Sequence, residues 1–152
     1  MMRVFKHLAL TGLAVATLNQ PVFAQAVDVA ALLGSADIAR GQTLYKDSCA
    51  SCHGADLEGQ ESWQTPKVDG QMPAPPHDRT GHTWHHGDGD LFDYTKLGGA
   101  EFLKSKGVAN FNSGMPGFAE TLGDQDIADV LAFIKSTWPD REREIQAGRT
   151  RP

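Results

Sequence analysis

Residues 49–53 read Cys49-Ala50-Ser51-Cys52-His53, and this C-x-x-C-H stretch decides how the rest of the chain is interpreted. The chain has two cysteines, both in this stretch, which excludes a disulfide-dense scaffold. Three kinds of site use C-x-x-C: a redox dithiol, half of a zinc site and, when a histidine follows, an attachment site for c-type haem. The dithiol would need a βαβ pattern around the motif, and zinc would need a second pair of ligands. The sequence offers neither.

Haem attachment accounts for the cysteines and the histidine of the motif. Thiols at positions i and i+3, at the end of a helix, can add to the two vinyl groups along one edge of a haem. The adjacent histidine then reaches the iron from one face. We therefore predict one covalent haem c as cofactor, with Cys49 and Cys52 forming the thioethers and His53 as an axial ligand.

A second axial ligand is needed for reversible electron transfer, and a thioether stabilises ferrous iron. The methionines are at positions 1, 2, 72 and 115, and the first two lie in a segment that we expect to be removed. Met115 lies in a glycine-rich turn just before the last predicted helix, far enough beyond His53 to reach the opposite face of the haem. Met115 is the predicted ligand, Met72 is the alternative, and a histidine ligand is a weaker third option.

The N-terminus has the order of a secretory signal, assigned to residues 1–26. Arg3 and Lys6 precede an apolar run at 8–18, and small residues follow, with cleavage expected after residue 24 or 26. An uncleaved anchor is disfavoured because the apolar run is too short to cross a bilayer. The protein is thus expected in the periplasm. This agrees with the motif, because haem c is attached outside the bacterial cytoplasm.

Length and composition fit one folded domain. The chain has 152 residues, of which 40% are hydrophobic and 22% charged, which is ordinary for a globular protein. The domain is assigned to 27–138, followed by a polar tail at 139–152 that we expect to fray. A net charge of −5 argues against nucleic acid and favours basic faces on partner proteins. We expect redox partner proteins, no membrane span and a monomer.

Hydrophobic periodicity predicts an all-α fold. One helix is expected over 35–49, capped by Ser35, and another over 124–137, with a shorter helix at 90–97 and a turn at 101–106. The long irregular stretch between the first and last helices is reasonable if its loops wrap a bulky cofactor. Gly41, in mid-helix, costs about 1 kcal/mol relative to alanine, which indicates a close helix contact.

Two motifs make the chain resemble the class I monohaem cytochromes c. The first is Gly41-x-x-Leu44-Tyr45-x-x-x-Cys49-Ala50-x-Cys52-His53-Gly54, which is similar to their N-terminal helix and haem-binding turn. The second joins the methionine loop at 112–118, Asn-Ser-Gly-Met-Pro-Gly-Phe, to the helical run at 126–134. The resemblance covers about 37–137 and is specific at its two ends.

The resemblance implies a small cytochrome c fold with crossed N- and C-terminal helices. In that fold a glycine and an aromatic residue of the first helix pack on the last, which implies contacts of Gly41 and Tyr45 with Val130 and Phe133. It also implies that a proline-loop carbonyl, within 70–76, accepts the Nδ1 proton of His53. The resemblance further implies that the protein shuttles single electrons between redox partners and does not itself catalyse bond-making chemistry.

A histidine-rich stretch at 77–86 has two interpretations. It contains His77, His82, His85 and His86. In the first, it is a polar loop along the haem edge, where Arg79, Trp84 and one or two histidines would bind the haem propionates. In the second, it holds another metal ion such as copper, because imidazoles suit copper and zinc. Asp88 and Asp90 could add oxygen ligands to such a site.

Two further functions remain open on the sequence. The protein could be the electron-donating subunit of a larger dehydrogenase or oxidase. It could also be a haem enzyme, which would require that Met115 is easily displaced from the iron.

Overall fold

The computed structural model describes residues 26–150. Its elements are helices joined by loops, and the described part of the chain contains no strand. The all-α prediction is therefore confirmed. The predicted signal segment lies outside the described residues, apart from residue 26. No helix within 26–150 is long and apolar enough to cross a membrane.

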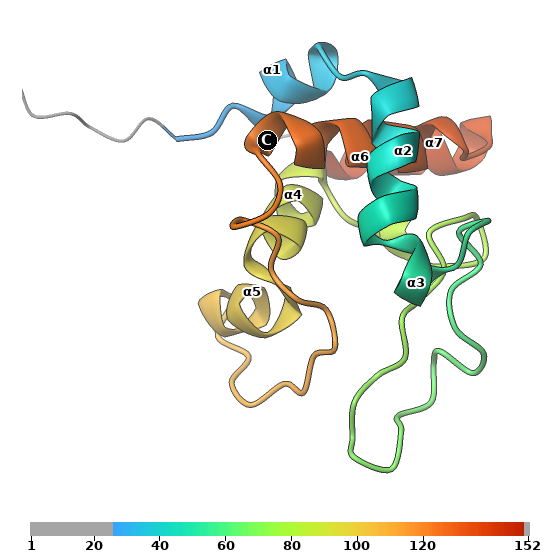
Figure 1. The fold of residues 1–152 in the computed structure, drawn as a ribbon, viewed down its shortest axis with the longest axis vertical. Coiled ribbons are helices and arrows are strands. Elements are labelled where there is room, and N and C mark those ends of the chain that lie inside the picture. The colour runs from blue at the N-terminus through green and yellow to red at the C-terminus, as the bar shows by residue number, and fades with distance from the viewer. Residues whose placement is uncertain (1–25, 151–152) are drawn as a thin grey trace, which may run out of the picture.

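Two crossed helices form the centre of the fold, α2 (Ile38–Ser48) and α6 (Asp124–Ser136) (Figure 1). A Cβ atom at Gly41 would collide with the carbonyl oxygen of Asp129 and lie 3.1 Å from the Cβ of Phe133. The two helix backbones meet at this point because glycine has no side chain. Tyr45 is fully buried and its ring centroid lies 5.5 Å from that of Phe133. The predicted helix crossing is confirmed.

The start of α2 corrects one prediction. Asp37, not Ser35, caps the helix, since its carboxylate accepts hydrogen bonds from the amides of Ala39 and Arg40. Ser35 instead follows α1 (Val29–Gly34), a helix that the sequence analysis did not predict, and its hydroxyl donates to the carbonyl of Leu32. The apolar side of α1 packs on α6 and on the cluster around Phe92.

Four further helices and one short turn complete the described chain. They are α3 (Ala50–His53), the 3-10 turn η1 (Thr83–His85), α4 (Asp88–Leu97), α5 (Gly99–Ser105) and α7 (Asp140–Thr150). Gly98, with a φ of 82°, lies between the end of α4 and the start of α5.

Within the described residues, the C-terminal tail forms the helix α7 as far as Thr150. The polar side chains of α7 make the contacts that hold it on η1 and α4. Gln146 is 2% exposed and its amide donates to the carboxylate of Asp88 at 2.6 Å. The hydroxyl of Thr150 accepts from the amide of Asp88 at 3.0 Å. The expectation of a frayed tail is wrong because α7 is held by polar contacts rather than by an apolar stripe.

Two long loops extend to the same side of the crossed helices (Figure 1). The first, 54–82, follows α3, and the second, 106–123, joins α5 to α6. The loops meet where the side-chain amide of Asn112 donates to the carbonyl of Asp69 at 3.0 Å. Gln71 also packs against Gly114, where an added Cβ would lie 2.9 Å from its amide carbon. These contacts join the two loops across the space below the crossed helices.

Candidate haem site

A cavity of about 780 Å³ lies between the two loops, and Cys49, Cys52 and His53 line it together with Met72 and Met115. The structure therefore brings all four predicted site residues, and the alternative methionine, to one cavity. Its volume is within the range of roughly 300–1,000 Å³ that is usual for sites of small molecules and cofactors. Many of the other lining residues are apolar, including Leu91, Phe118, Val130 and Leu131.

The cysteine motif lies where α2 ends. The amide of Cys49 donates to the carbonyl of Tyr45, and the chain turns at this residue into α3. The two cysteines form no disulfide, and Cys49 is buried whereas Cys52 is exposed. Burial raises the pKa of the Cys49 thiol to about 11, and Cys52 adds to the effect. Before haem attachment the Cys49 thiol is therefore protonated at neutral pH, and neither sulfur is used in a disulfide.

His53 is 6% exposed and is held by one hydrogen bond of its side chain. Its Nδ1 lies 2.9 Å from the carbonyl oxygen of Pro75. Since a carbonyl only accepts, Nδ1 carries the proton and Nε2 keeps a lone pair for a metal. Burial lowers the pKa of His53, although the bond to Pro75 opposes this effect. The acceptor for His53 is thus Pro75 among the residues of the 70–76 loop.

Met115 is held by its own loop and by the junction of α4 and α5. Its carbonyl accepts from the amide of Gly99 at 3.1 Å, and its amide donates to the hydroxyl of Ser113 at 3.2 Å. Gly98 lies so close to Gly117 that an added Cβ would be 2.5 Å from its amide nitrogen. These contacts fix the backbone of the methionine loop on the side of the cavity formed by α4 and α5.

Met72 belongs to the loop that holds His53. It lies three residues before Pro75, and the same loop pairs with Gln60, whose amide donates to the carbonyl of Ala74 at 2.8 Å. Met72 and Met115 both line the cavity, so the lining alone does not distinguish them as ligands.

The histidines of 77–86 do not form one cluster. His77, His82 and His86 line the cavity, whereas His85 lies against Trp84 with ring centroids 3.7 Å apart. No group of three or more His, Cys, Asp or Glu residues within 26–150 is arranged to hold a metal ion. The geometry therefore does not support the copper interpretation.

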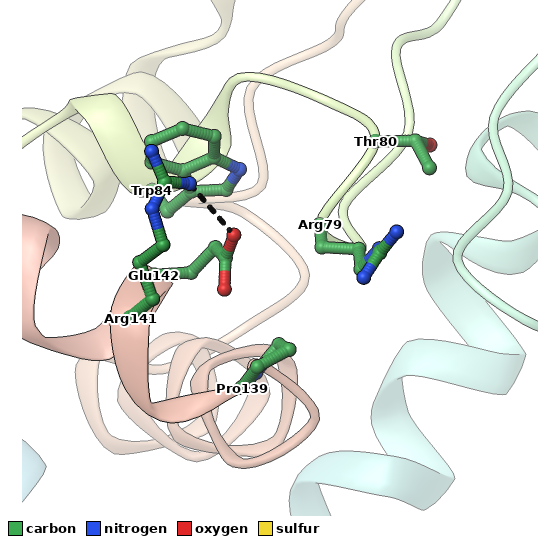
Figure 2. A pocket seen from close by; sticks show the side chains of 6 residues that line it. All are labelled: Arg79, Thr80, Trp84, Pro139, Arg141 and Glu142. Atoms are coloured by element: carbon green, nitrogen blue, oxygen red, sulfur yellow. Dashed lines mark hydrogen bonds and ion pairs between the residues drawn. The ribbon is translucent and has the colours of Figure 1, made fainter.

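Arg79 and Trp84 are not among the residues that line the large cavity. They line a second cavity of about 530 Å³ beside the start of α7, together with Glu142 (Figure 2). The guanidinium of Arg141 donates to the carboxylate of Glu142 at 3.3 Å on one side of this space. The second cavity shares no lining residue with the first. The proposed contact of Arg79 and Trp84 with haem propionates stays a prediction, and the indole nitrogen of Trp84 is buried without a hydrogen-bond partner among the described residues.

One feature of the large cavity was not predicted from the sequence. The ring of His77 stacks on that of His53, with centroids 4.0 Å apart and planes inclined by 20°. The signal in the sequence was a histidine two residues after a proline of the 70–76 loop. It was missed because nothing in the sequence indicated which proline carbonyl would bind His53.

Comparison with known proteins agrees with this geometry. The Cytochrome c family model matches residues 38–138. The chain is also 31% identical over 127 residues to the gluconate 2-dehydrogenase cytochrome c subunit of Pantoea cypripedii. That match covers 79% of this chain and 25% of the relative, so the chain spans about a quarter of the relative's length. No solved structure matches the chain. The chain belongs to the cytochrome c family, and its cofactor is the covalently bound haem c that this family carries.

Proposed function

We propose that this protein transfers single electrons through one haem, bound covalently by Cys49 and Cys52 and ligated by His53 and Met115. The observation that carries the proposal is the arrangement of His53, whose Nδ1 binds Pro75 while the ring lines a cavity shared with both thiols and Met115. When bound, the haem supplies a one-electron couple between ferric and ferrous iron.

The residues of the chain account for the remaining properties of such a carrier. The hydrogen bond from His53 to Pro75 fixes the imidazole tautomer and increases its basicity as a ligand. Apolar residues such as Leu131 and Phe118 limit the access of water to the cavity, and this is one of the factors that set the reduction potential of a haem.

Met115 is the better candidate for the second axial position. Its loop is bound to the α4–α5 junction, whereas Met72 belongs to the loop whose Pro75 carbonyl binds His53. Met115 would hold the iron from the loop that does not hold His53, which favours it over Met72. If His53 and Met115 both held the iron, no position would be open for a substrate, and the protein would act as a carrier rather than as an enzyme.

The electronic spectrum of the purified protein tests this function. We expect the reduced form to show the bands of haem c, and the oxidised form to show the weak absorption of a methionine–iron bond. Carbon monoxide should bind slowly or not at all to the reduced native protein at neutral pH. Rapid binding of carbon monoxide, without the methionine band, would instead support a haem enzyme with an open iron position.

A second candidate function is that of an electron-donating subunit. The similarity to the cytochrome c subunit of gluconate 2-dehydrogenase favours it, since the relative is named as part of a dehydrogenase. The partner would then be a dehydrogenase, and the chain would accept its electrons. Co-purification from the native host distinguishes the two, because a subunit should elute with a dehydrogenase and a free carrier should elute alone.

Export to the periplasm is part of the proposal. The basic and apolar segments of residues 1–26 support it. The mature protein from a periplasmic extract should begin at Gln25 or at Val27, as measured by N-terminal sequencing. An intact N-terminus in a cytoplasmic fraction would contradict it.

A further inference from the structure

His77 makes the face contact to the ring of His53. The two imidazoles lie nearly parallel, with centroids 4.0 Å apart and an angle of 20° between their planes. Both residues line the large cavity, although they are far apart in the sequence. Tyr45 lies with its ring edge-on to His77, at a centroid distance of 6.3 Å. His77 therefore lies among the aromatic groups of the wall that holds His53.

The backbone of His77 is fixed at both of its polar groups. Its amide donates to the carbonyl of Leu57 at 2.8 Å. Its carbonyl accepts from the indole nitrogen of Trp138 at 2.7 Å, and Trp138 is almost completely buried. The position of His77 is thus set by the 54–82 loop and by the end of the helical core.

The imidazole of His77 is fixed as well. Its Nδ1 lies 2.8 Å from the hydroxyl of Thr83, a buried residue. That hydroxyl also lies 3.4 Å from the carbonyl of Pro76, to which it donates its proton. It therefore accepts from Nδ1–H of His77. His77 presents a rigid aromatic face to His53 because its backbone and its side chain are both bonded.

The bond from His53 to Pro75 does not by itself fix the plane of the His53 ring. Together with the covalent bond at Cγ, a single hydrogen bond at Nδ1 holds two points of the ring, and the ring can still tilt about the line through them. A parallel ring against one face opposes this pivoting, because tilting would bring the two rings into collision. The stacked His77 therefore restrains the tilt of the His53 ring, which the hydrogen bond to Pro75 leaves free.

We propose that His77 is a positioning residue that sets the plane of the His53 imidazole relative to the haem. The proposal rests on the proposed ligation of the iron by His53. The plane of an axial imidazole determines how unpaired electron density is distributed over a ferric haem. The shifts of the haem methyl protons and the electron paramagnetic resonance g values report this distribution directly.

The test compares four variants of the haem-loaded protein in the ferric state. H77L removes both the stacked ring and the bond to Thr83, whereas H77F keeps a ring and removes only the bond. T83V keeps the histidine and frees its ring. H85F is the matched control, since His85 belongs to the same stretch but lies on Trp84 outside the cavity.

We expect H77L to change the order or the spread of the haem methyl shifts and to shift the g values. H77F and T83V should each change the shifts in the same direction as H77L but less, because a stacked ring remains and only its bond to Thr83 is lost, and H85F should change nothing. The methionine–iron absorption should be retained throughout, which localises the change to the His53 side. If H77L does not yield folded protein, H77F and T83V carry the test by themselves.

Wild-type methyl shifts and g values in H77L would overturn the proposal. It would also be overturned by wild-type values in T83V together with altered values in H77F, because the ring face would then not matter. Failure of the proposed function gives a different result, since the wild-type protein itself would then lack haem or the methionine band.

Discussion

The backbone of Gly41 lies directly against the carbonyl group of Asp129, where α2 crosses α6. Any side chain at residue 41 would collide with that carbonyl and press on Phe133. The crossing brings Tyr45 onto α6 and places Cys49 one turn further along, at the wall of the cavity. The distance between two helix backbones thus determines where the C-x-x-C-H motif is held.

Replacement of Gly41 by alanine should destabilise the protein. The added methyl group forces α2 and α6 apart, and such overpacking costs about 1–3 kcal/mol in the free energy of unfolding. Chemical denaturation of the haem-loaded protein measures this. G89A is the matched control, because a Cβ at Gly89 of α4 meets no atom within 4 Å. G89A should be neutral or stabilising by up to about 1 kcal/mol. Equal stability of G41A and the wild type would contradict the close contact.

Replacement of Asp129 by alanine should also be destabilising. Asp129 is 1% exposed, and its carboxylate accepts from the amide of Asp37, the guanidinium of Arg40 and the amide of Gln125. Loss of this acceptor leaves partly buried donors unpaired, at a cost of about 2–3 kcal/mol in the free energy of unfolding. The control variant E101A removes an exposed ion pair of α5 and should change the free energy of unfolding by less than about 0.5 kcal/mol. A D129A variant as stable as E101A would contradict this account.

The helix α7 should depend on Gln146. Its amide donates to the carboxylate of Asp88 and, at 3.3 Å, to the carbonyl of His86. Q146A should therefore lower the free energy of unfolding by about 1–3 kcal/mol, measured by thermal or chemical denaturation. E144A is the control, since Glu144 is exposed on the same helix. If the two variants unfold alike, the polar contacts of α7 do not stabilise the fold.

Met115 and Met72 should behave differently when each is replaced by alanine. M115A should lose the methionine–iron absorption of the oxidised protein and should bind carbon monoxide rapidly once reduced, because an axial position opens. M72A should retain the absorption and resist carbon monoxide. Absorption spectra of both variants under the same conditions make the comparison. The opposite pattern would assign the axial position to Met72.

Local signals predicted much of this molecule. Cys49, Cys52 and His53 lie within five residues, so their spacing alone indicates haem attachment. The apolar repeat of α6 is likewise visible within one short segment. Gly41 predicted a close helix contact because an exposed helix would gain stability from alanine at that position.

Contacts between distant polar residues were not predictable in the same way. The helix α7 has little apolar surface, and its stability depends on Gln146 reaching Asp88, which no periodicity indicates. Arg79 and Trp84 line the second cavity, which no pattern in the sequence indicated. The stack of His77 on His53 depends on which proline carbonyl binds the ligand ring.

The mass of the denatured, exported protein tests the central claim most directly. Produced in a host that matures c-type haem, the protein should have the mass of the processed chain plus one haem, and neither thiol should react with an alkylating reagent. Folded, colourless protein with the mass of the chain alone, and with both Cys49 and Cys52 alkylated, would contradict the account.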